Sequence, residues 1–177
     1  PCAEKVSSYL VEVYMNTRSY DAALKSIDRI AKPSAQILEA KQKILFQLGT
    51  QSFANADFEQ ALKYLNQSIA IGQYNRQTKA DAYYWCGESY YRLNRMVEAA
   101  RDFNAYLQLT TQPNNEMYAL ANYNLGYIAF HRKDYTQASN YFQKYIQLEK
   151  GENATALADA YNRIGDCHLH VRNFEEA

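Results

Sequence analysis

Residues 121–148 read ANYNLGYIAFHRKDYTQASNYFQKYIQL, and this stretch decides the fold because it occurs three times with changes. The other full copies are 44–71, ILFQLGTQSFANADFEQALKYLNQSIAI, and 82–109, AYYWCGESYYRLNRMVEAARDFNAYLQL. A partial copy, AYNRIGDCHLHVRNFEEA, occupies 160–177. Self-similarity at a fixed period of this size is typical of a protein built from stacked repeats.

One glycine and one alanine fix the register of the copies. The glycines, spaced 38, 39 and 39 residues apart, are Gly49, Gly87, Gly126 and Gly165. The alanines, each twelve residues after its glycine, are Ala61, Ala99, Ala138 and Ala177. Upstream, Ala23 lies 38 residues before Ala61, and Val11 occupies the glycine position. A partial or atypical unit therefore precedes the first full one.

Each copy contains two helical periodicities. In 121–148, Tyr123, Tyr127 and Phe130 are spaced i, i+4 and i+7 along one helical face, and the second half repeats such spacing from Ala138. The polar connection between the halves is short, which predicts an antiparallel helical hairpin. We expect the glycine where the two helices cross closely, with the alanine on the other side of the seam.

Breakers separate the hairpins: Pro33, Gly72, Pro113 and Gly151. Ser34, Thr78 and Asn153 are the expected N-caps of the helices that follow. No strand-like alternation occurs, so we predict an all-α chain, a superhelical solenoid of helical hairpins. We expect a single array over 1–177, with a partial or atypical unit 3–33, units 34–72, 77–112 and 116–150, and a truncated unit 154–177.

Composition argues against several function classes. The chain has 19 basic and 19 acidic residues, and no basic stripe is visible, so no nucleic-acid partner is expected. No apolar run reaches the roughly 18 residues of a membrane span. The three cysteines and three histidines show neither zinc nor triad spacing. We therefore expect no enzyme activity, no cofactor and no metal.

The recurring residues resemble the tetratricopeptide repeat (TPR). Counting Gly49 as position 8 of a unit puts Phe58 at position 17, Ala61 at 20 and Leu65 at 24, as in that family. HEAT repeats, the other family near this period, lack the glycine-to-alanine spacing of twelve. The resemblance implies helical hairpins in tandem and a protein or peptide partner.

The period of 38 to 39 exceeds the 34 residues of the family, and the extra residues follow the alanine. Such lengthened units are similar to those of bacterial cell-envelope scaffold proteins. The chain begins at Pro1, and we interpret it as an internal fragment of a longer bacterial protein. Its compartment stays open between the cytoplasm and the bacterial periplasm or cell envelope.

The resemblance also implies where a partner binds, because first helices of TPR hairpins line the concave side. By register, the expected protein-binding residues are Lys43, Phe46, Asp81, Tyr84, Glu88, Tyr91, Arg92, Tyr123, Tyr127, Phe130, His131, Asn162, Asp166 and His170. We expect Tyr84, Tyr123 and Tyr127 to be exposed in a groove. For Tyr91 and Phe130, packing between helices is an equally good interpretation.

Some TPR proteins bind a terminal carboxylate through lysine, asparagine and arginine at fixed positions. Asn124 and Arg163 suit that role, but Glu88 and Asp159 stand where the other cationic or amide groups are needed. Two carboxylates would repel a third, so we reject this mode.

The expected function is a non-catalytic protein–protein interaction scaffold that binds a segment or helix of a partner along its concave face. The alternative is a structural assembly element that stacks end to end, on its own continuation or on a partner subunit. The latter includes self-association through exposed end helices.

Overall fold

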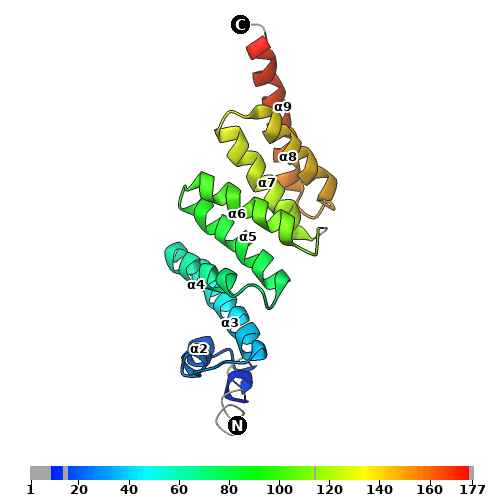
Figure 1. The fold of residues 1–177 in the computed structure, drawn as a ribbon. Helices are drawn as coiled ribbons and strands as arrows, with labels where there is room; N and C mark the ends of the chain where they lie inside the picture. Colours follow the sequence, from blue (N-terminus) through cyan, green and yellow to red (C-terminus); the bar gives the residue numbers. More distant parts are fainter. Residues whose placement is uncertain (1–8, 14–15, 114, 176–177) are drawn as a thin grey trace. The chain divides into compact units, whose positions relative to one another are not determined.

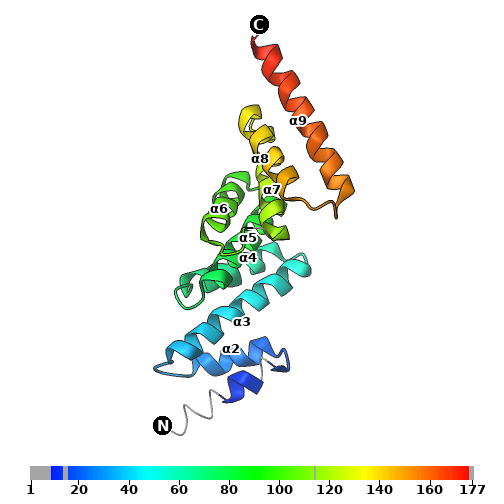
Figure 2. The same ribbon diagram turned by 90° about the vertical axis from the view of Figure 1, so that its right-hand side faces the viewer.

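The computed structural model describes residues 9–13, 16–113 and 115–175, and these contain helices and no strand (Figures 1 and 2). The helices after the helical stretch 9–13 are α2 (Tyr20–Asp28), α3 (Ala35–Ala54), α4 (Phe58–Ala70), α5 (Arg76–Arg92), α6 (Met96–Leu109), α7 (Glu116–His131), α8 (Tyr135–Leu148) and α9 (Ala154–Glu175). The predicted all-α class is confirmed.

The chain divides into two compact units, residues 1–110 and 111–177. In the first unit α3 packs on α4, α5 packs on α6, and α4 also packs on α5. In the second unit α7 packs on α8, which in turn packs on α9. Sequence neighbours are thus spatial neighbours, as short connections require. The organisation of 1–177 as one array stays a prediction.

Side-chain oxygens at the helix starts accept the backbone N–H groups that have no partner inside the helix. The N-caps that do so are Ser34, Asp57, Asn75, Asn115 and Asp134. Asn153 also accepts the N–H of Ala156, at 3.0 Å. The prediction that Thr78 caps its helix is wrong. Asn75 is the cap of α5, and it accepts the N–H of Thr78 at 2.9 Å.

The turn inside each hairpin places a residue other than glycine in the left-handed region. These residues, all five positions before the alanine of the second helix, are Arg18, Ala56, Asn94 and Lys133, with φ of 56°, 59°, 59° and 61°. In the last three of these turns the next residue donates its N–H back into the first helix, as Asp134 does to Ala129 O at 3.0 Å. This C-terminal helix motif reverses the chain direction in the same way each time.

The glycines lie at the closest approach of the paired helices. A methyl group built on Gly49, Gly87 or Gly126 would lie 2.6, 2.8 and 2.8 Å from the nearest atom of a large apolar side chain. Those side chains, each sixteen residues later, are Leu65, Phe103 and Phe142. The expected close crossing is present, but this large residue faces the glycine directly. The alanine four residues earlier is itself fully buried in the same core.

A buried glutamine holds the first helices of the first unit in register. Gln42 of α3 is fully buried, and its side-chain amide donates to Asn75 O at 2.8 Å and accepts from Asn75 N at 3.0 Å. Ser68 of α4 donates to the backbone carbonyl of Gln42 at 2.8 Å. Because a buried amide needs its partners, these bonds fix the start of α5 against the middle of α3.

We expect Gly126→Leu to lower the free energy of unfolding by about 1–3 kcal/mol, because the added side chain overlaps the ring of Phe142. The matched control is Gly165→Ala. Gly165 has no atom within 4 Å of the added carbon, so this change should raise stability by up to about 1 kcal/mol through helix propensity. Urea unfolding followed by circular dichroism measures both changes. Equal losses at the two sites would contradict the close-crossing explanation.

Candidate protein-binding surface

The residues predicted to bind a partner lie on the first helices of the hairpins, α3 and α5 in one unit and α7 and α9 in the other. We call the α3–α5 surface with Lys43, Asp81 and Glu88 the first patch. The α7–α9 surface with Tyr127 and Asp166 is the second patch.

Charged side chains of the first patch form ordered contacts. Lys43 pairs with Glu39 at 2.7 Å, and Asn75 donates to the same Glu39 oxygen at 3.3 Å. Both contacts lower the pKa of Glu39, the Lys43 hydrogen bond most strongly. Asp81 is half-buried and accepts from Gln77 at 2.7 Å. Burial raises the pKa of Asp81, so this carboxylate favours a cationic neighbour.

Tyr84 is not exposed in a groove, which corrects the expectation for this residue. Its side chain is 4% exposed, and its ring packs edge-on against Phe103 and Tyr106 of α6 at centroid distances of 5.8 and 5.4 Å. The reason is that the helix crossing at the glycine one turn later draws this face of α5 into the hairpin core. The Tyr84 hydroxyl donates to Glu88 at 3.1 Å.

The remaining predicted residues of the first patch have graded exposure. Phe46, Glu88 and Tyr91 are half-buried, and Arg92 is exposed. Burial raises the pKa of the Tyr91 hydroxyl, with a smaller effect from Glu88. A hollow of about 550 Å³ adjoins α3, lined by Arg18, Tyr20, Gln47, Thr50 and Gln51.

The second patch is organised around one carboxylate. Tyr123 and Tyr127 of α7 both donate their hydroxyl hydrogens to the same oxygen of Asp159 on α9, Tyr123 at 2.8 Å. Their rings meet edge-on at 5.2 Å, and both are half-buried. Burial and the Asp159 hydrogen bond raise the pKa of Tyr123 to about 12 and that of Tyr127 further in the same direction.

Arg163 continues the second patch along α9. Its guanidinium contacts the Asp166 carboxylate at 2.8 Å and lies 3.6 Å from that of Asp159. The guanidinium carbon, Cζ, lies 5.7 Å from the ring centroid of Phe130. Phe130 is half-buried, so the packing interpretation holds for part of its surface. The second patch thus combines the aromatic rings of Tyr123, Tyr127 and Phe130 with a row of three charged side chains, Asp159, Arg163 and Asp166.

Three predicted residues border this row and are exposed: His131, Asn162 and His170. The His170 ring stacks on Tyr135 of α8, with centroids 4.4 Å apart and an interplanar angle of 9°. His170 is therefore held in place by the fold, although its edge reaches solvent.

Three residues of the second patch, Asp159, Arg163 and Tyr135, are absent from the predicted set of protein-binding residues. The signal for Asp159 was its 36-residue separation from Tyr123, close to one period, which places both on facing first helices. Counting positions within one repeat did not show that the hydroxyls of Tyr123 and Tyr127 bond the carboxylate of Asp159 in the next repeat.

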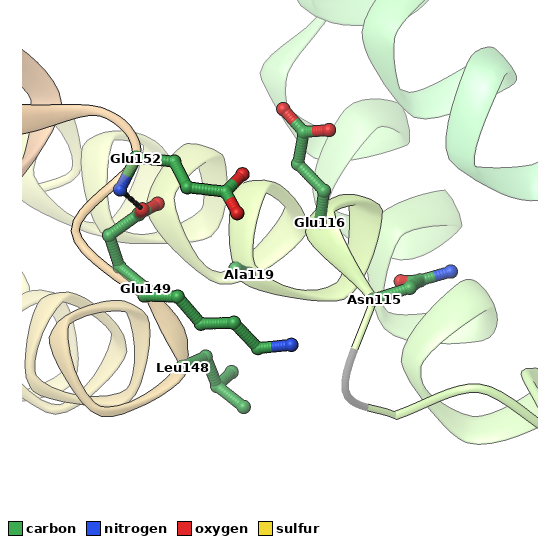
Figure 3. Close-up of a pocket in the computed structure, with 7 residues that line it drawn as sticks. Asn115, Glu116, Ala119, Leu148, Glu149 and Glu152 are labelled. Carbon is green, nitrogen blue, oxygen red and sulfur yellow. Dashed lines mark hydrogen bonds between the residues drawn. The ribbon is translucent and has the colours of Figure 1, made fainter.

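A separate small cavity of about 90 Å³ lies at the start of α7 and the end of α8 (Figure 3). Glu149 borders it, and its carboxylate accepts the backbone N–H groups of Glu152 at 2.9 Å and Asn153 at 3.3 Å. Tyr145 donates to the other oxygen of Glu149 at 3.0 Å. These bonds stabilise the turn before α9.

Among the described ranges, no set of three or more His, Cys, Asp or Glu side chains is arranged to hold a metal ion. Within the same ranges, no helix has both the length and the hydropathy needed to cross a bilayer.

The fold and the repeated seam define a class, the all-α solenoid proteins built from tandem helical hairpins. Family models described as tetratricopeptide repeat match residues 46–116 and 119–151, together more than half of the chain. The chain belongs to the tetratricopeptide repeat family, and as a member it is a protein–protein interaction scaffold. The resemblance inferred from the glycine and alanine positions is confirmed.

Solved structures of similar fold include those of MamA, BtubC and YrrB. MamA aligns with a TM-score of 0.60 at 18% identity, over 98% of this chain and 88% of its own. BtubC from P. vanneervenii aligns with a TM-score of 0.64 at 14% identity, over 97% of this chain and 74% of its own. YrrB aligns with a TM-score of 0.62 at 16% identity, over 92% of this chain and 75% of its own. No curated protein sequence matches significantly. At these identities the likeness concerns the fold.

We expect Tyr123 to titrate near pH 12 in the folded chain, against about 10 for an ordinary tyrosine. Because the unfolded chain loses this proton first, the stability of the second unit should fall as pH rises from about 10 through 12. Asp159→Asn removes the negative charge but keeps the shape, so the Tyr123 pKa should fall while burial keeps it above the ordinary value. Ring-carbon NMR of labelled tyrosine measures both. An unchanged Tyr123 titration in the variant would contradict the assigned contact.

Proposed function

We propose that this scaffold binds an extended segment or a helix of a partner protein along its first helices, through the first and second patches. The observation that supports this most is the second patch, where Asp159 fixes the hydroxyls of Tyr123 and Tyr127. Tyrosine and arginine side chains are the residues most often found to dominate binding energy. Because their positions are set before binding, less conformational entropy is lost when a partner arrives.

The charges of the two patches indicate the chemistry of the bound segment. In the second patch the carboxylates Asp159 and Asp166 outnumber the single guanidinium of Arg163. In the first patch, the carboxylates of Glu39, Asp81 and Glu88 outnumber the cationic side chains of Lys43 and Arg92. An excess of carboxylate in each patch favours a partner segment with lysine or arginine beside aromatic or aliphatic residues.

One structural neighbour supports a peptide ligand by analogy of fold. YrrB is described as a TPR protein with an unusual peptide-binding site. That property belongs to YrrB, and for this chain it adds plausibility to a peptide-sized partner.

The test uses peptides selected on the wild-type chain from a displayed library of random 15-residue peptides. We expect the selected peptides to be enriched in lysine and arginine. Asp166→Ala should weaken their binding roughly ten-fold, or about 1.4 kcal/mol, because a charge contact to the partner is lost. Isothermal titration calorimetry measures the change.

Glu98→Ala is the matched control. Glu98 lies on a second helix, α6, and pairs with Arg95 at 2.8 Å in the same i,i+3 arrangement that Asp166 has with Arg163. Removing Glu98 should leave peptide affinity unchanged. Equal affinity of all three proteins, or selected peptides without basic residues, would refute binding through the second patch.

A second candidate function is structural assembly through an end of the array. The observation that favours it is an exposed apolar face on α9, with Tyr161 58% and Leu169 62% exposed. Leu169 lies three residues after Asp166 on α9, so this face adjoins the second patch.

A further inference from the structure

The solvent-facing side of α5 carries an indole between two carboxylates. Asp81, Trp85 and Glu88 are spaced i, i+4 and i+7, so each carboxylate lies one turn from the indole on the same helical face. All three side chains are half-buried, whereas Ala82 and Cys86, which face the hairpin core, are buried. Trp85 is the single tryptophan of the chain, and it is absent from the predicted set of protein-binding residues.

Ring contacts fix the orientation of this indole. Phe53 of α3 meets it edge-on, with a centroid distance of 4.9 Å and an interplanar angle of 60°. Tyr84 meets it at 5.4 Å and 87°. Because Trp85 is half-buried, part of its surface stays accessible to a ligand. Tryptophan is the aromatic side chain that binds cations best, so this ring is a fixed platform for a positive charge.

The repeated helix crossing does not account for this tryptophan. The same register position, two residues before the glycine, is Gln47, Asn124 and Arg163 in the other copies. A polar residue is therefore compatible with the hairpin at this position. The indole is a particular feature of the second full copy.

The last copy shows what two carboxylates at these positions hold. Of the four copies, only those of α5 and α9 have a carboxylate six residues before and another one residue after the glycine. On α9 the residue between them is Arg163, whose guanidinium contacts Asp166 at 2.8 Å and lies 3.6 Å from Asp159. Its Cζ also lies 5.7 Å from the ring centroid of Phe130. This fold thus holds a guanidinium between two such carboxylates and beside an aromatic ring.

The helix α5 has the same pair of carboxylates without the arginine between them. The half-buried carboxylate of Asp81 accepts a hydrogen bond from the amide of Gln77 at 2.7 Å, and Glu88 accepts one from the Tyr84 hydroxyl at 3.1 Å. Both donors are neutral, so they do not balance the charges. Arg92 follows Glu88 by one turn and lies outside the interval between the carboxylates. Where α9 has its own guanidinium, α5 therefore offers an external one an aromatic ring and two carboxylates.

We infer that an arginine side chain of the bound partner segment stacks on Trp85, with its guanidinium between Asp81 and Glu88. The inference rests on the function proposed above and names the side chain that the first patch recognises. Arginine suits this site better than lysine because its planar head group stacks on aromatic rings and can donate to two carboxylates at once. An ammonium is a compact and strongly hydrated charge.

The first experiment tests the site without a partner segment. N-acetyl-arginine amide is titrated into the nitrogen-labelled 177-residue chain, and NMR follows the single indole N–H resonance, that of Trp85. We expect a saturable shift in the millimolar range. N-acetyl-citrulline amide, a neutral analogue of nearly the same shape, should bind at least roughly ten-fold more weakly, and N-acetyl-lysine amide roughly three-fold more weakly.

Asp81→Asn is the informative variant, because it removes one charge and keeps the indole as the reporter. It should weaken binding of the arginine amide roughly five-fold. Glu98→Gln is the matched control, since it removes a carboxylate from α6 in the same compact unit, and it should bind as wild type does. Circular dichroism spectra of both variants should match that of wild type.

Trp85→Arg supplies the guanidinium from within the chain, as Arg163 does on α9. The arginine amide should then no longer shift the backbone amide resonances of α5. A Trp85→Arg variant that is folded and still binds the amide as wild type does would refute the site.

The second experiment uses the tightest of the peptides selected on the wild-type chain. Each arginine of that peptide is replaced in turn by citrulline. One replacement should weaken binding to wild type roughly ten-fold, but binding to the Asp81→Asn variant by less than roughly three-fold, because both changes remove the same contact.

The outcomes separate this inference from the proposed function. A saturable indole shift with no selected peptide that binds supports the arginine site and refutes the proposed function. Peptides that bind through no arginine coupled to Asp81 refute the inference and leave the proposed function. Equal binding of the arginine and citrulline amides overturns the site, and equal binding of the arginine and lysine amides overturns the assignment to arginine.

Discussion

The structure depends on the contact between a glycine and a large apolar residue sixteen positions later. This contact sets how closely the two helices of a hairpin approach, as in Gly87 against Phe103. A glycine inside a helix costs about 1 kcal/mol relative to alanine, and the close packing it permits offsets that cost. This crossing positions α3, α5 and α7 against their second helices, whereas α9 has no such contact at Gly165.

The crossing also decides which aromatic residues are core and which are surface. On α5 it draws Tyr84 against Phe103 and Tyr106, so a residue that looks suited to a groove fills the hairpin instead. On α7 the ring of Tyr123 packs in the same way against Phe142 and Tyr145 of α8, while its hydroxyl and that of Tyr127 reach Asp159 of α9. The same register position therefore has the same ring packing in the two hairpins, but its hydroxyl has a different partner in each, Glu88 for Tyr84 and Asp159 for Tyr123.

The hairpins were predictable because their signals are local. Short polar turns, two helical periodicities and a glycine at a fixed distance from an alanine each act within one unit. The cap of α5 shows the limit of such reasoning. Thr78 and Asn75 are both good cap residues, and the choice of Asn75 depends on Gln42, which is 33 residues away and binds its backbone. The contacts of Asp159 with Tyr123 and Tyr127 could not be predicted for the same reason, since they join two consecutive repeats.

The sequence by itself determined the all-α class, the hairpin, the family and the seam, because these follow from residue spacing that repeats with the period. Only the tertiary structure decided that Tyr84 is buried, that Asp159 organises the second patch and that one face of α9 is exposed. The physical reason is that burial and hydrogen bonding depend on which side chain the next helix supplies. That partner lies about one period away, and its identity is not repeated from unit to unit.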